Sequence, residues 1–515
     1  MSIFITFNPP KKTDFLSLFQ LSVIEIKLTK NIHMNFFTKT LFIVCFLLNF
    51  NLQAQEVVEV TFLGNTSKAE LSSINSALIP FLKNGVDSYE VIYTSVDLEG
   101  NTVNVSGLMC VPDDNTKRYP LLCYAHGTSG SPEDVPSDPE NGNALLTRIW
   151  GGLGYVSIAS DLLGLGVHEG IHPFVHAESE AWVAADMLKA IRAYAEANDI
   201  FINDQIFTTG YSQGGHSSMA LHRELELNQS DEFTVTAASH QSGPYDISGV
   251  MRDLLFIEED YGFVAYLPNT AIAYEAVYGN FYEELGDIFK PQYVDLIQQF
   301  ADDEINLFDL NQQLIDSLIL YNGVAAPGKL FKDDLIIELQ NNPDHPINVA
   351  LRDNDVYDWA PTAPTQILYC TADDQVPFMN SIVAKDGMDA NGSTTVTLFD
   401  VDPDATHGEC VFPAFTSALF FFLSQQSIED VSGTYDISFD LPFDVFPNPV
   451  DNKLTIKDLP EDGELVLLDM AGRQVFQTMV SEGNQVLDLT AVNGGVYVMQ
   501  IFGAETVWQQ KLVVR

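Results

Sequence analysis

A serine set between two glycines is the clearest group in this chain with surroundings suited to chemistry. Residues Gly210-Tyr211-Ser212-Gln213-Gly214 form the pattern G-x-S-x-G, directly after the apolar segment "QIFTTG" and at the start of a helical pattern. There the serine would occupy a tight strand-to-helix turn that exposes its hydroxyl, and small residues on either side avoid collisions with nearby backbone. The pattern alone is common in turns. Its position between an apolar strand and a helix is what predicts that Ser212 is a nucleophile.

A serine hydroxyl attacks a carbonyl only when a base takes its proton and a carboxylate orients that base. In a fold of alternating strands and helices these partners are expected after the serine, the acid first, each just past a late strand. The segment "LYCTADDQVP" supplies Asp373 at a strand end, and "DVDPDATHGEC" supplies His407 past the next strand. The sequence therefore predicts a triad of Ser212, Asp373 and His407, with Asp374 as the rival acid.

Two other histidines are rivals for the base. His216 and His240 follow Ser212 closely and precede the late strands, which places them too early in the chain. His216 lies inside the helix that follows Ser212, where packing or a local hydrogen bond is expected. The base is therefore assigned to His407.

The negative oxygen of a tetrahedral intermediate needs backbone N–H donors. One is expected from Gln213, whose amide lies at the N-terminus of the helix after Ser212. The other is expected from the loop "YAHGTSG", where glycine lets the chain approach a substrate; Thr128 is the nominated donor and Gly127 the alternative. Each such donor lowers a reaction barrier by roughly 3–4 kcal/mol.

A second constellation, "HEGIH" at residues 168–172, spells H-E-x-x-H, in which two histidines bind zinc and the glutamate activates water. Zinc binding by this motif requires a helix that puts both histidines on one face. Gly170 falls between them, and Pro173 disfavours a helical conformation at the residue before it. His176 does not supply a persuasive third ligand. The sequence predicts a loop up to a helix that begins near Ala177, and no metal site.

The framework for these residues is predicted over about residues 88–430. Strand-like segments such as "YEVIYTSV", "VNVSGLMCV" and "GYVSIAS" give way to helical patterns such as "AESEAWVAADMLKAIRAYAEAN". This alternation predicts the α/β class, a mostly parallel sheet covered by helices on both faces. The first two strands lack an intervening helix, so they are expected to form an antiparallel edge.

The strand pattern is interrupted over roughly residues 244–360, about 115 residues rich in helical periodicity. A segment of this length between strands is an inserted subdomain rather than a loop. Its aromatic residues include Phe256, Tyr266, Tyr274 and Phe281, which suggest an apolar pocket for the acyl part of a substrate.

From about residue 88 to 430 the chain resembles an α/β-hydrolase, and more narrowly the secretory lipase family. The motifs that carry the resemblance are "AHGT", "SDLLGLG", "GYSQGG", "TADDQVP" and "THGEC". It implies an eight-stranded sheet, a helical lid inserted before the acid strand, and hydrolysis of carboxylic esters without a cofactor. The α/β-hydrolase domain is accordingly assigned to residues 56–430. The lid varies within the family, so acyl-chain preference does not carry over.

Residues 443–515 change character. Short alternating segments such as "KLTIKD" and "VYVMQIF" are separated by turn residues, which predicts a small antiparallel β-sandwich, immunoglobulin-like in form, after a linker at 431–442. The stretches "VFPNPVDNKLTI", "LLDMAGRQVF" and "LTAVNGGVYVMQI" closely resemble the C-terminal sorting domain of type IX secretion cargo. That resemblance implies export across the outer membrane by this machinery, followed by release or surface attachment. A carbohydrate-binding sandwich is the alternative.

The N-terminal region has the pattern of a targeting signal. Residues 34–55, "MNFFTKTLFIVCFLLNFNLQAQ", have a lysine near the start and an apolar run of about a dozen residues, as expected of a secretory signal peptide cleaved near Ala54 or Gln55. A membrane anchor is the alternative, although the run is short for a bilayer. Because such signals begin a chain, residues 1–33 are interpreted as a misassigned start ahead of Met34.

The charge balance excludes one class of partner. With 71 Asp and Glu against 24 Lys and Arg, the formal net charge is −47. Such a surface repels phosphate backbones, so nucleic-acid binding is not expected. The hydrophobic content of 46% is enough to bury a large core, over two or three domains in a chain of this length.

Four cysteines lie outside the signal region. The α/β-hydrolase topology would place Cys370 and Cys410 on segments that end adjacent strands, so a disulfide there would tie the acid loop to the histidine loop. Cys110 and Cys123 would fall on strands separated by a third strand. They are expected to be buried thiols.

Three hypotheses for function follow. The favoured one is a secreted serine esterase or lipase acting on a small-molecule or lipid ester. A serine peptidase of the same fold is the alternative. The sequence shows no propeller-like domain that would gate peptides, which makes this hypothesis the weaker one. A catalytically inactive surface-binding protein is the third, opposed by the complete triad. Acyl-chain length, alcohol specificity and oligomeric state are left open.

Overall fold

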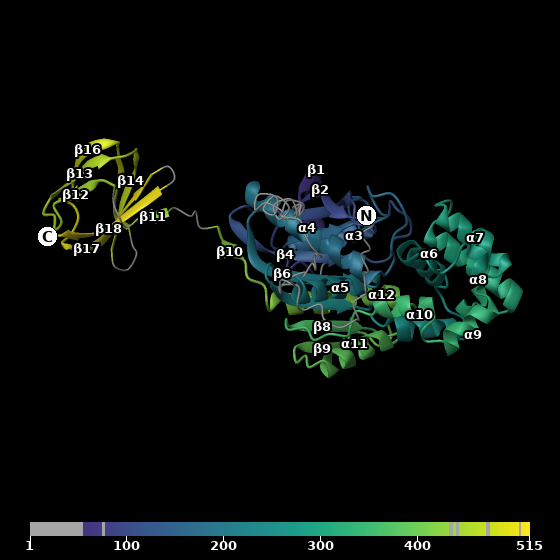
Figure 1. Ribbon diagram of the computed structural model, residues 1–515. Helices are drawn as coiled ribbons and strands as arrows, with labels where there is room; N and C mark the ends of the chain where they lie inside the picture. Colours follow the sequence, from purple (N-terminus) through teal and green to yellow (C-terminus); the bar gives the residue numbers. More distant parts are fainter. Residues whose placement is uncertain (1–54, 75–77, 432–435, 439–441, 470–473, 504–505) are drawn as a thin grey trace, which may run out of the picture. The chain divides into compact units, whose positions relative to one another are not determined.

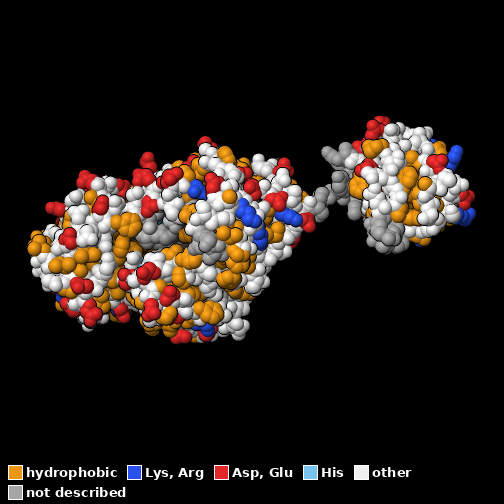
Figure 2. Space-filling model, turned by 180° about the vertical axis from the view of Figure 1, so that it is seen from behind, with side chains coloured by type: hydrophobic (Ala, Val, Ile, Leu, Met, Phe, Trp, Pro, Cys, Tyr) orange, Lys and Arg blue, Asp and Glu red, His pale blue; other side chains and the backbone are white. Residues whose placement is uncertain are grey.

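A computed structural model of the protein describes residues 55–74, 78–431, 436–438, 442–469, 474–503 and 506–515. The predictions for residues 1–33 and for the signal peptide at 34–55, apart from its last residue, lie outside this part of the chain. No helix within the described ranges is both long and apolar enough to cross a membrane. Figure 2 shows acidic side chains spread over the displayed face and few basic ones, in keeping with the net charge of −47.

The described residues form a central sheet of ten strands in the order β1-β2-β3-β5-β4-β6-β7-β8-β9, with β10 paired to β4 (Figure 1). Strands β4 to β9 pair with one another in parallel. Strands β1, β2 and β3 pair antiparallel, and β3 is antiparallel to β5. The strands are β1 Val57–Thr66, β2 Val86–Val96, β3 Thr102–Pro112, β4 Lys117–Ala125, β5 Val156–Ser160, β6 Ile202–Tyr211, β7 Val235–Gln241, β8 Thr365–Tyr369, β9 Val396–Asp400 and β10 Glu429–Asp430.

The eight strands β2 to β9 make up the predicted sheet. The described sheet has ten strands instead of eight, because β1 and β10 were not expected. Strand β10 has only two residues. Strand β1 carries no fully buried side chain, because it pairs only with β2 at the edge of the sheet. Residues 58–62, VEVTF, alternate apolar and polar side chains as a strand does, but the predicted sheet begins at about residue 88. The edge of the sheet is therefore β1, with the antiparallel pair β2 and β3 one place further in.

Helices cover both faces of the sheet. Neighbouring residues of a strand point to opposite faces, so they pack against different helices. Leu121 of β4 packs in one cluster with Met187, whereas Leu122 packs in another with Trp150 and Phe422. The first cluster also contains residues of α5, and the second contains residues of α2. The helices on the two faces are α2 Lys68–Ile74, α3 Gly142–Gly152, α4 Ala177–Ala197, α5 Gln213–Leu227, α11 Met379–Ala390 and α12 His407–Leu423.

The insertion between β7 and β8 is helical, as the sequence predicts. Figure 1 shows α6 to α9 gathered to one side of the sheet. They enclose an apolar core of their own, in which Phe289, Leu310 and Leu314 are fully buried. We call residues 244–360 the lid. Its helices are α6 Tyr266–Tyr278, α7 Pro291–Ala301, α8 Leu307–Asn322, α9 Asp333–Asn341 and α10 Pro346–Asp353, with shorter turns at Ile247–Met251, Leu254–Phe256, Leu285–Asp287 and Pro327–Leu330.

The C-terminal region is all β. Its described strands form a five-stranded sheet, β11-β18-β17-β14-β15, and a three-stranded sheet, β12-β13-β16. Leu454, Ile456, Leu465 and Met499 belong to one apolar core shared by strands of both sheets. The strands are β11 Asp436–Ser438, β12 Asp444–Phe446, β13 Lys453–Leu459, β14 Gly463–Asp469, β15 Gln474–Val480, β16 Gly483–Asp488, β17 Gly495–Phe502 and β18 Thr506–Val514.

Candidate active site

Ser212 lies in the sharp turn between the end of β6 and the start of α5. Its backbone has φ 62° and ψ −126°, a conformation that L-residues rarely adopt. The two glycines of the motif permit the turn. A Cβ atom at Gly210 would lie 2.2 Å from the carbonyl oxygen of Gly214, and one at Gly214 would lie 2.0 Å from that of Ala125. The spacing of the motif is therefore a steric requirement of this turn.

The structure brings Ser212, His407 and Asp373 together. His407 Nε2 is 2.8 Å from Ser212 Oγ, and His407 Nδ1 is 2.7 Å from Asp373 Oδ2. Because the carboxylate accepts the proton on Nδ1, the lone pair of Nε2 faces the serine hydroxyl. All three residues follow parallel strands, β6, β8 and β9, at the carboxyl edge of the sheet where sites of this class of fold gather.

Further contacts fix the acid and the base. Asp373 Oδ1 accepts the backbone N–H groups of Gln375 and Val376 at 3.0 and 2.8 Å. The Tyr211 hydroxyl donates to the backbone carbonyl of His407 at 2.5 Å. Asp374, the rival acid, accepts the backbone N–H of His407 at 3.0 Å. Its carboxylate therefore contacts the main chain of His407 and leaves the ring to Asp373.

The rival histidines bind elsewhere. His240 Nδ1 is 2.8 Å from Ser218 Oγ, and its other ring nitrogen faces His222 at 3.3 Å. His216 Nδ1 is 2.8 Å from a carboxylate oxygen of Glu180, on another helix, and its Nε2 is 3.0 Å from the backbone carbonyl of Asn354. The expectation for His216 was packing or a local hydrogen bond. The residue is fully buried, as packing requires, but its hydrogen-bond partners lie 36 and 138 residues away in the sequence.

The two nominated oxyanion donors lie beside Ser212. Gln213 is the first residue of α5, where backbone N–H groups have no partner within the helix. Gly127, the residue before Thr128, is close enough that a Cβ there would lie 4.0 Å from that of Ser212. Thr128, Ser212 and Gln213 line the same cavity. The two segments thus flank the place where a substrate carbonyl would meet the serine.

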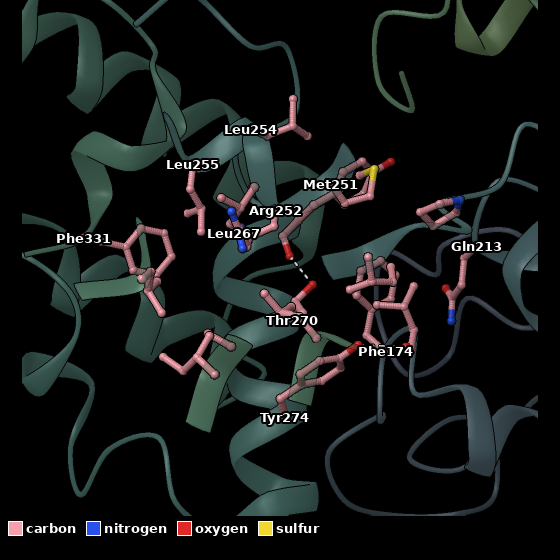
Figure 3. Close-up of a pocket in the computed structure, with 18 of the residues that line it drawn as sticks. Phe174, Gln213, Met251, Arg252, Leu254, Leu255, Leu267, Thr270, Tyr274 and Phe331 are labelled. Atoms are coloured by element: carbon pink, nitrogen blue, oxygen red, sulfur yellow. Dashed lines mark hydrogen bonds between the residues drawn. The ribbon is translucent and has the colours of Figure 1, made fainter. Parts of the chain in front are cut away.

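This cavity extends from Ser212 into the lid, and its lining is almost entirely apolar (Figure 3). In the view of Figure 3, Gln213 and Phe174 lie at one side, Leu255 and Phe331 at the other, and Thr270 between them. Helix α6 contributes one wall. The lid residues that line the cavity include Ile247, Met251, Leu254, Leu255, Tyr266, Leu267, Thr270, Ala271, Tyr274, Phe281, Ile288, Phe331, Leu339, Ile347 and Leu351.

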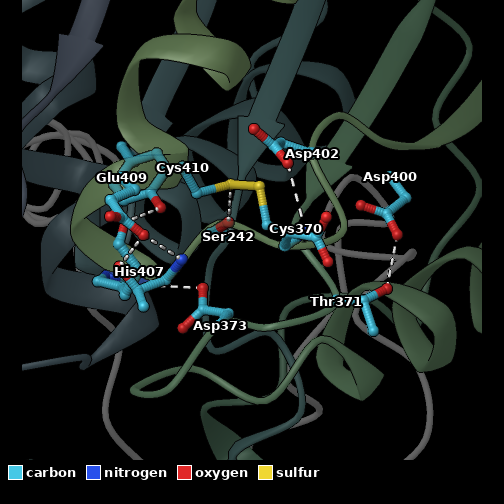
Figure 4. The surroundings of a disulfide bond; sticks show 12 residues. Ser242, Cys370, Thr371, Asp373, Asp400, Asp402, His407, Glu409 and Cys410 are labelled. Atoms are coloured by element: carbon cyan, nitrogen blue, oxygen red, sulfur yellow. Dashed lines mark hydrogen bonds and ion pairs between the residues drawn. A yellow bond between two sulfur atoms is a disulfide. The ribbon is translucent and has the colours of Figure 1, made fainter.

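A disulfide joins Cys370 and Cys410 behind the acid and the base (Figure 4). Cys370 ends the strand segment before Asp373, and Cys410 lies in the first turn of α12, which begins at His407. The link therefore ties together the two segments that carry the acid and the base. Cys110 on β3 and Cys123 on β4 are free and buried, with β5 between their strands, and burial raises the pKa of each thiol to about 12.

The H-E-x-x-H stretch is a loop. Gly164, Gly166 and Gly170 all have positive φ, and the next helix begins at Ala177, as predicted. His168 Nδ1 accepts the backbone N–H of Gly164 at 3.0 Å. The segment therefore does not supply the helical frame on which the zinc motif depends.

Sequence reasoning missed one buried acid near the site. Glu180 of α4 is 1% exposed, and its two carboxylate oxygens bind Gln213 Nε2 and His216 Nδ1, each at 2.8 Å. A signal was present in the helical spacing. Glu180 lies three and seven residues before Val183 and Met187, which are fully buried, so it belongs to the inward face of the helix.

Comparison with known proteins covers both parts of the chain. Residues 444–515 match the model of the secretion system C-terminal sorting domain. This domain marks proteins that the type IX system exports to the cell surface or outside, and it implies that secretion machinery as a partner. No curated protein matches the chain.

Solved structures resemble the catalytic region. A rice cell wall degrading esterase, LipA from Xanthomonas oryzae, is 25% identical with a TM-score of 0.63, over 72% of this chain and 97% of that one. A putative hydrolase from Legionella pneumophila is 24% identical with a TM-score of 0.65, over 72% and 98%. The fold is that of an α/β-hydrolase. Candida antarctica lipase A in its closed state shares this fold at 16% identity and a TM-score of 0.52, over 72% and 81%. Among these α/β-hydrolases, the similarity to the esterase supports an ester hydrolase.

Proposed function

We propose that this protein hydrolyses carboxylic esters through an acyl-enzyme on Ser212. The observation that carries the proposal is the continuous hydrogen-bonded chain from Asp373 through His407 to Ser212, with distances of 2.7 and 2.8 Å, at the end of an apolar cavity. Such a chain converts a hydroxyl into a nucleophile. The apolar cavity beside it offers space for an acyl group.

The reaction would run in two halves. Ser212 Oγ attacks the ester carbonyl carbon while its proton passes to His407 Nε2, and the carbonyl electron pair moves onto the oxygen, which the N–H groups of Gln213 and Thr128 stabilise. The C–O bond to the alcohol then breaks, and His407 returns the proton to the leaving alcohol. Water repeats the attack on the acyl-serine with the same base, and the carboxylic acid leaves.

The acyl side of the substrate is proposed to be an apolar chain. Phe331 and Leu255 lie on the opposite side of the cavity from Gln213, and the lining is mostly apolar, with Thr270 and Arg252 as polar members (Figure 3). Each methylene that such a cavity removes from water contributes about 0.8 kcal/mol to binding. Esters of medium or long fatty acids therefore fit this site better than acetyl esters.

The deciding experiment compares wild type with Ser212→Ala on nitrophenyl esters of increasing chain length and on peptide substrates. The expected result is ester hydrolysis that rises with chain length and falls by roughly 10⁴-fold or more in Ser212→Ala. Equal rates for the two proteins would overturn the proposal. Faster cleavage of peptides than of esters would favour a peptidase, and binding without turnover would favour an inactive binding protein.

We also propose that the mature protein begins near Gln55, with the catalytic domain at 56–430, a linker at 431–442 and the sorting domain at 443–515. Strand β11, which lies within the proposed linker, pairs with β18 of the C-terminal sheet. The match of residues 444–515 to a sorting domain supports an exported chain. N-terminal sequencing of the exported protein tests the first boundary, with a start at residue 55 or 56 expected. A mature protein that retained residues upstream of Met34 would contradict it.

A further inference from the structure

The side chain of Gln213 is held in place by two residues from other parts of the chain. Its amide nitrogen is 2.8 Å from Glu180 Oε1 and 2.8 Å from His172 Nε2. Because a carboxylate accepts only, the nitrogen must be the atom of the amide that faces Glu180. The two N–H bonds of the amide are then both used. Gln213 itself is 1% exposed, so no solvent competes for these bonds.

Glu180 is in turn held by His216. The second carboxylate oxygen of Glu180 is 2.8 Å from His216 Nδ1, and both residues are almost wholly buried. His216 Nε2 faces the backbone carbonyl of Asn354 at 3.0 Å. Both ring nitrogens therefore face oxygen acceptors. Burial alone would raise the pKa of Glu180, but the charge of His216 and the hydrogen bonds from His216 and Gln213 hold it below its usual value.

His172, from the H-E-x-x-H stretch, supplies the other anchor. Its Nδ1 is 2.8 Å from the backbone carbonyl of Leu163, to which it donates a proton, so Nε2 presents a lone pair to the Gln213 amide. Desolvation of the ring lowers the pKa of His172 to about 4, which keeps this neutral form at neutral pH. The loop residue is therefore an acceptor of fixed direction.

These anchors act on the residue whose backbone N–H is the nominated oxyanion donor. The Ser212–Gln213 peptide lies in a strained turn, with φ 62° at Ser212, and its orientation depends on what holds the residues after it. A donor stabilises a developing oxyanion only when its direction is set before the reaction. Helix α4 and the 161–176 loop hold the Gln213 side chain from two directions, and so limit rotation of this peptide.

We propose that Glu180 and His172 are positioning residues that fix the oxyanion donor of Gln213 by binding its side-chain amide. The inference rests on the proposed function, since it presupposes an oxyanion at Ser212. It assigns His172 a role in acyl transfer, in place of the zinc ligation that its sequence motif suggests. Neither residue contacts the reacting atoms in this role; both act through Gln213.

The test uses the full-length protein and two measurements. The first is the rate at which a fluorophosphonate labels Ser212, a reaction that places a phosphoryl oxygen at the oxyanion site. The second is kcat and KM for a nitrophenyl ester. His172→Phe keeps an aromatic ring, somewhat larger than imidazole, and removes the acceptor. We expect it to lower the labelling rate and kcat roughly 10- to 100-fold, with KM changed less than about threefold.

Two further variants separate positioning from general damage. His168→Phe makes the same substitution in the same loop, away from Gln213, and should keep kcat within about twofold. Gln213→Ala keeps the backbone N–H and removes the anchored amide, so adding His172→Phe to it should cost little more, because both changes break one linkage. Glu180→Met removes both acceptor oxygens and should lower kcat as His172→Phe does. If this variant fails to fold, the His172 and Gln213 variants still decide.

Each outcome has a consequence. If wild type is labelled at Ser212 and His172→Phe is labelled at the same rate, this inference is overturned while the proposed function stands. Losses that add fully in the double variant, or an equal loss in His168→Phe, overturn it as well, because the effect would not pass through Gln213. A wild type that is not labelled at Ser212 overturns the proposed function, and the inference with it.

Discussion

Asp374 binds the main chain of His407, while its neighbour Asp373 binds the ring of the same residue. Asp374 Oδ1 accepts the His407 N–H at 3.0 Å, and Asp373 Oδ2 lies 2.7 Å from Nδ1. Two adjacent carboxylates therefore hold one histidine at two points. In the proposed mechanism they have different roles, because only the contact to the ring selects the tautomer that can accept the serine proton.

Neutral substitutions should separate these roles. Asp373→Asn places an amide beside the His407 ring and favours the wrong tautomer, so we expect kcat for ester hydrolysis to fall by roughly 10⁴-fold. Asp374→Asn keeps an oxygen that can accept the His407 N–H, so its loss should stay below about tenfold. Steady-state kinetics on one nitrophenyl ester compares them. Equal losses in the two variants would contradict the assignment of Asp373 as the acid.

The length of the acyl cavity should be adjustable at Thr270. This residue lies between the two sides of the cavity in Figure 3, so Thr270→Phe should block the part nearest Phe331. Excluding two or more methylenes, at about 0.8 kcal/mol each, costs roughly tenfold or more in kcat/KM for long-chain esters. For esters of a four-carbon acid, kcat/KM should change less than about threefold.

The control for this change is Ala276→Phe, an exposed position on the same helix α6. It should leave the chain-length profile as in wild type. A profile that Thr270→Phe leaves unshifted would mean that the acyl chain lies elsewhere.

Removal of the disulfide should destabilise the catalytic region. The bond between Cys370 and Cys410 has a sequence separation of 40, for which loop-closure entropy predicts about 4 kcal/mol of stabilisation. The double variant Cys370→Ser with Cys410→Ser should unfold at a lower urea concentration than wild type, and kcat should fall as the acid and histidine segments lose their link. Reductant should lower the wild-type midpoint and leave that of the double variant unchanged. If wild type and the double variant unfold at the same urea concentration without reductant, the disulfide contributes nothing to the stability.

The buried carboxyl of Asp186 should make stability depend on pH. Burial raises its pKa from 3.8 to about 6, and its Oδ2 accepts a hydrogen bond from Ser95 at 2.7 Å. The folded state therefore holds the proton more tightly than the unfolded state. The resulting stabilisation is complete below about pH 4 and is lost as the pH rises through about 6.

Asp186→Asn removes this ionisation. Relative to wild type, the variant should gain on the order of 2 kcal/mol in free energy of unfolding at pH 8, and nothing near pH 4. Urea unfolding at the two pH values measures the difference. Glu196→Gln, an exposed position on the same helix, is the control and should differ little from wild type at either pH. A gain of equal size at both values would disprove the linkage.

Features set by local sterics and periodicity could be predicted from the sequence. The requirement for Gly210 and Gly214 comes from backbone atoms within the turn itself and from the strand beside it. The segments that carry Asp373 and His407 follow strands with clear apolar patterns, and the order of those strands brings both to Ser212. Strand β1 was not predicted, although residues 58–62 alternate apolar and polar side chains as a strand does.

Features that depend on distant partners could not be predicted. The sequence favoured Asp373 over Asp374 because it is nearer the strand end, but it could not predict that Asp374 accepts the main-chain N–H of His407. His216 and Glu180 are 36 residues apart, and their pairing requires α4 and α5 to pack side by side. In the lid, aromatic content predicted an apolar pocket, which Tyr266, Tyr274 and Phe281 line, whereas Phe256 packs against the apolar core of the lid instead.

The Cys370–Cys410 bond encloses both Asp373 and His407 within one covalent ring of main chain. A protease that cut the exposed turn at Asn391 and Gly392 would open this ring without releasing either piece. The carboxylate and the imidazole would stay attached to the same molecule, on two fragments joined through sulfur. A protein exported to the cell surface or outside can thus be cut in this segment and still keep both side chains in one molecule.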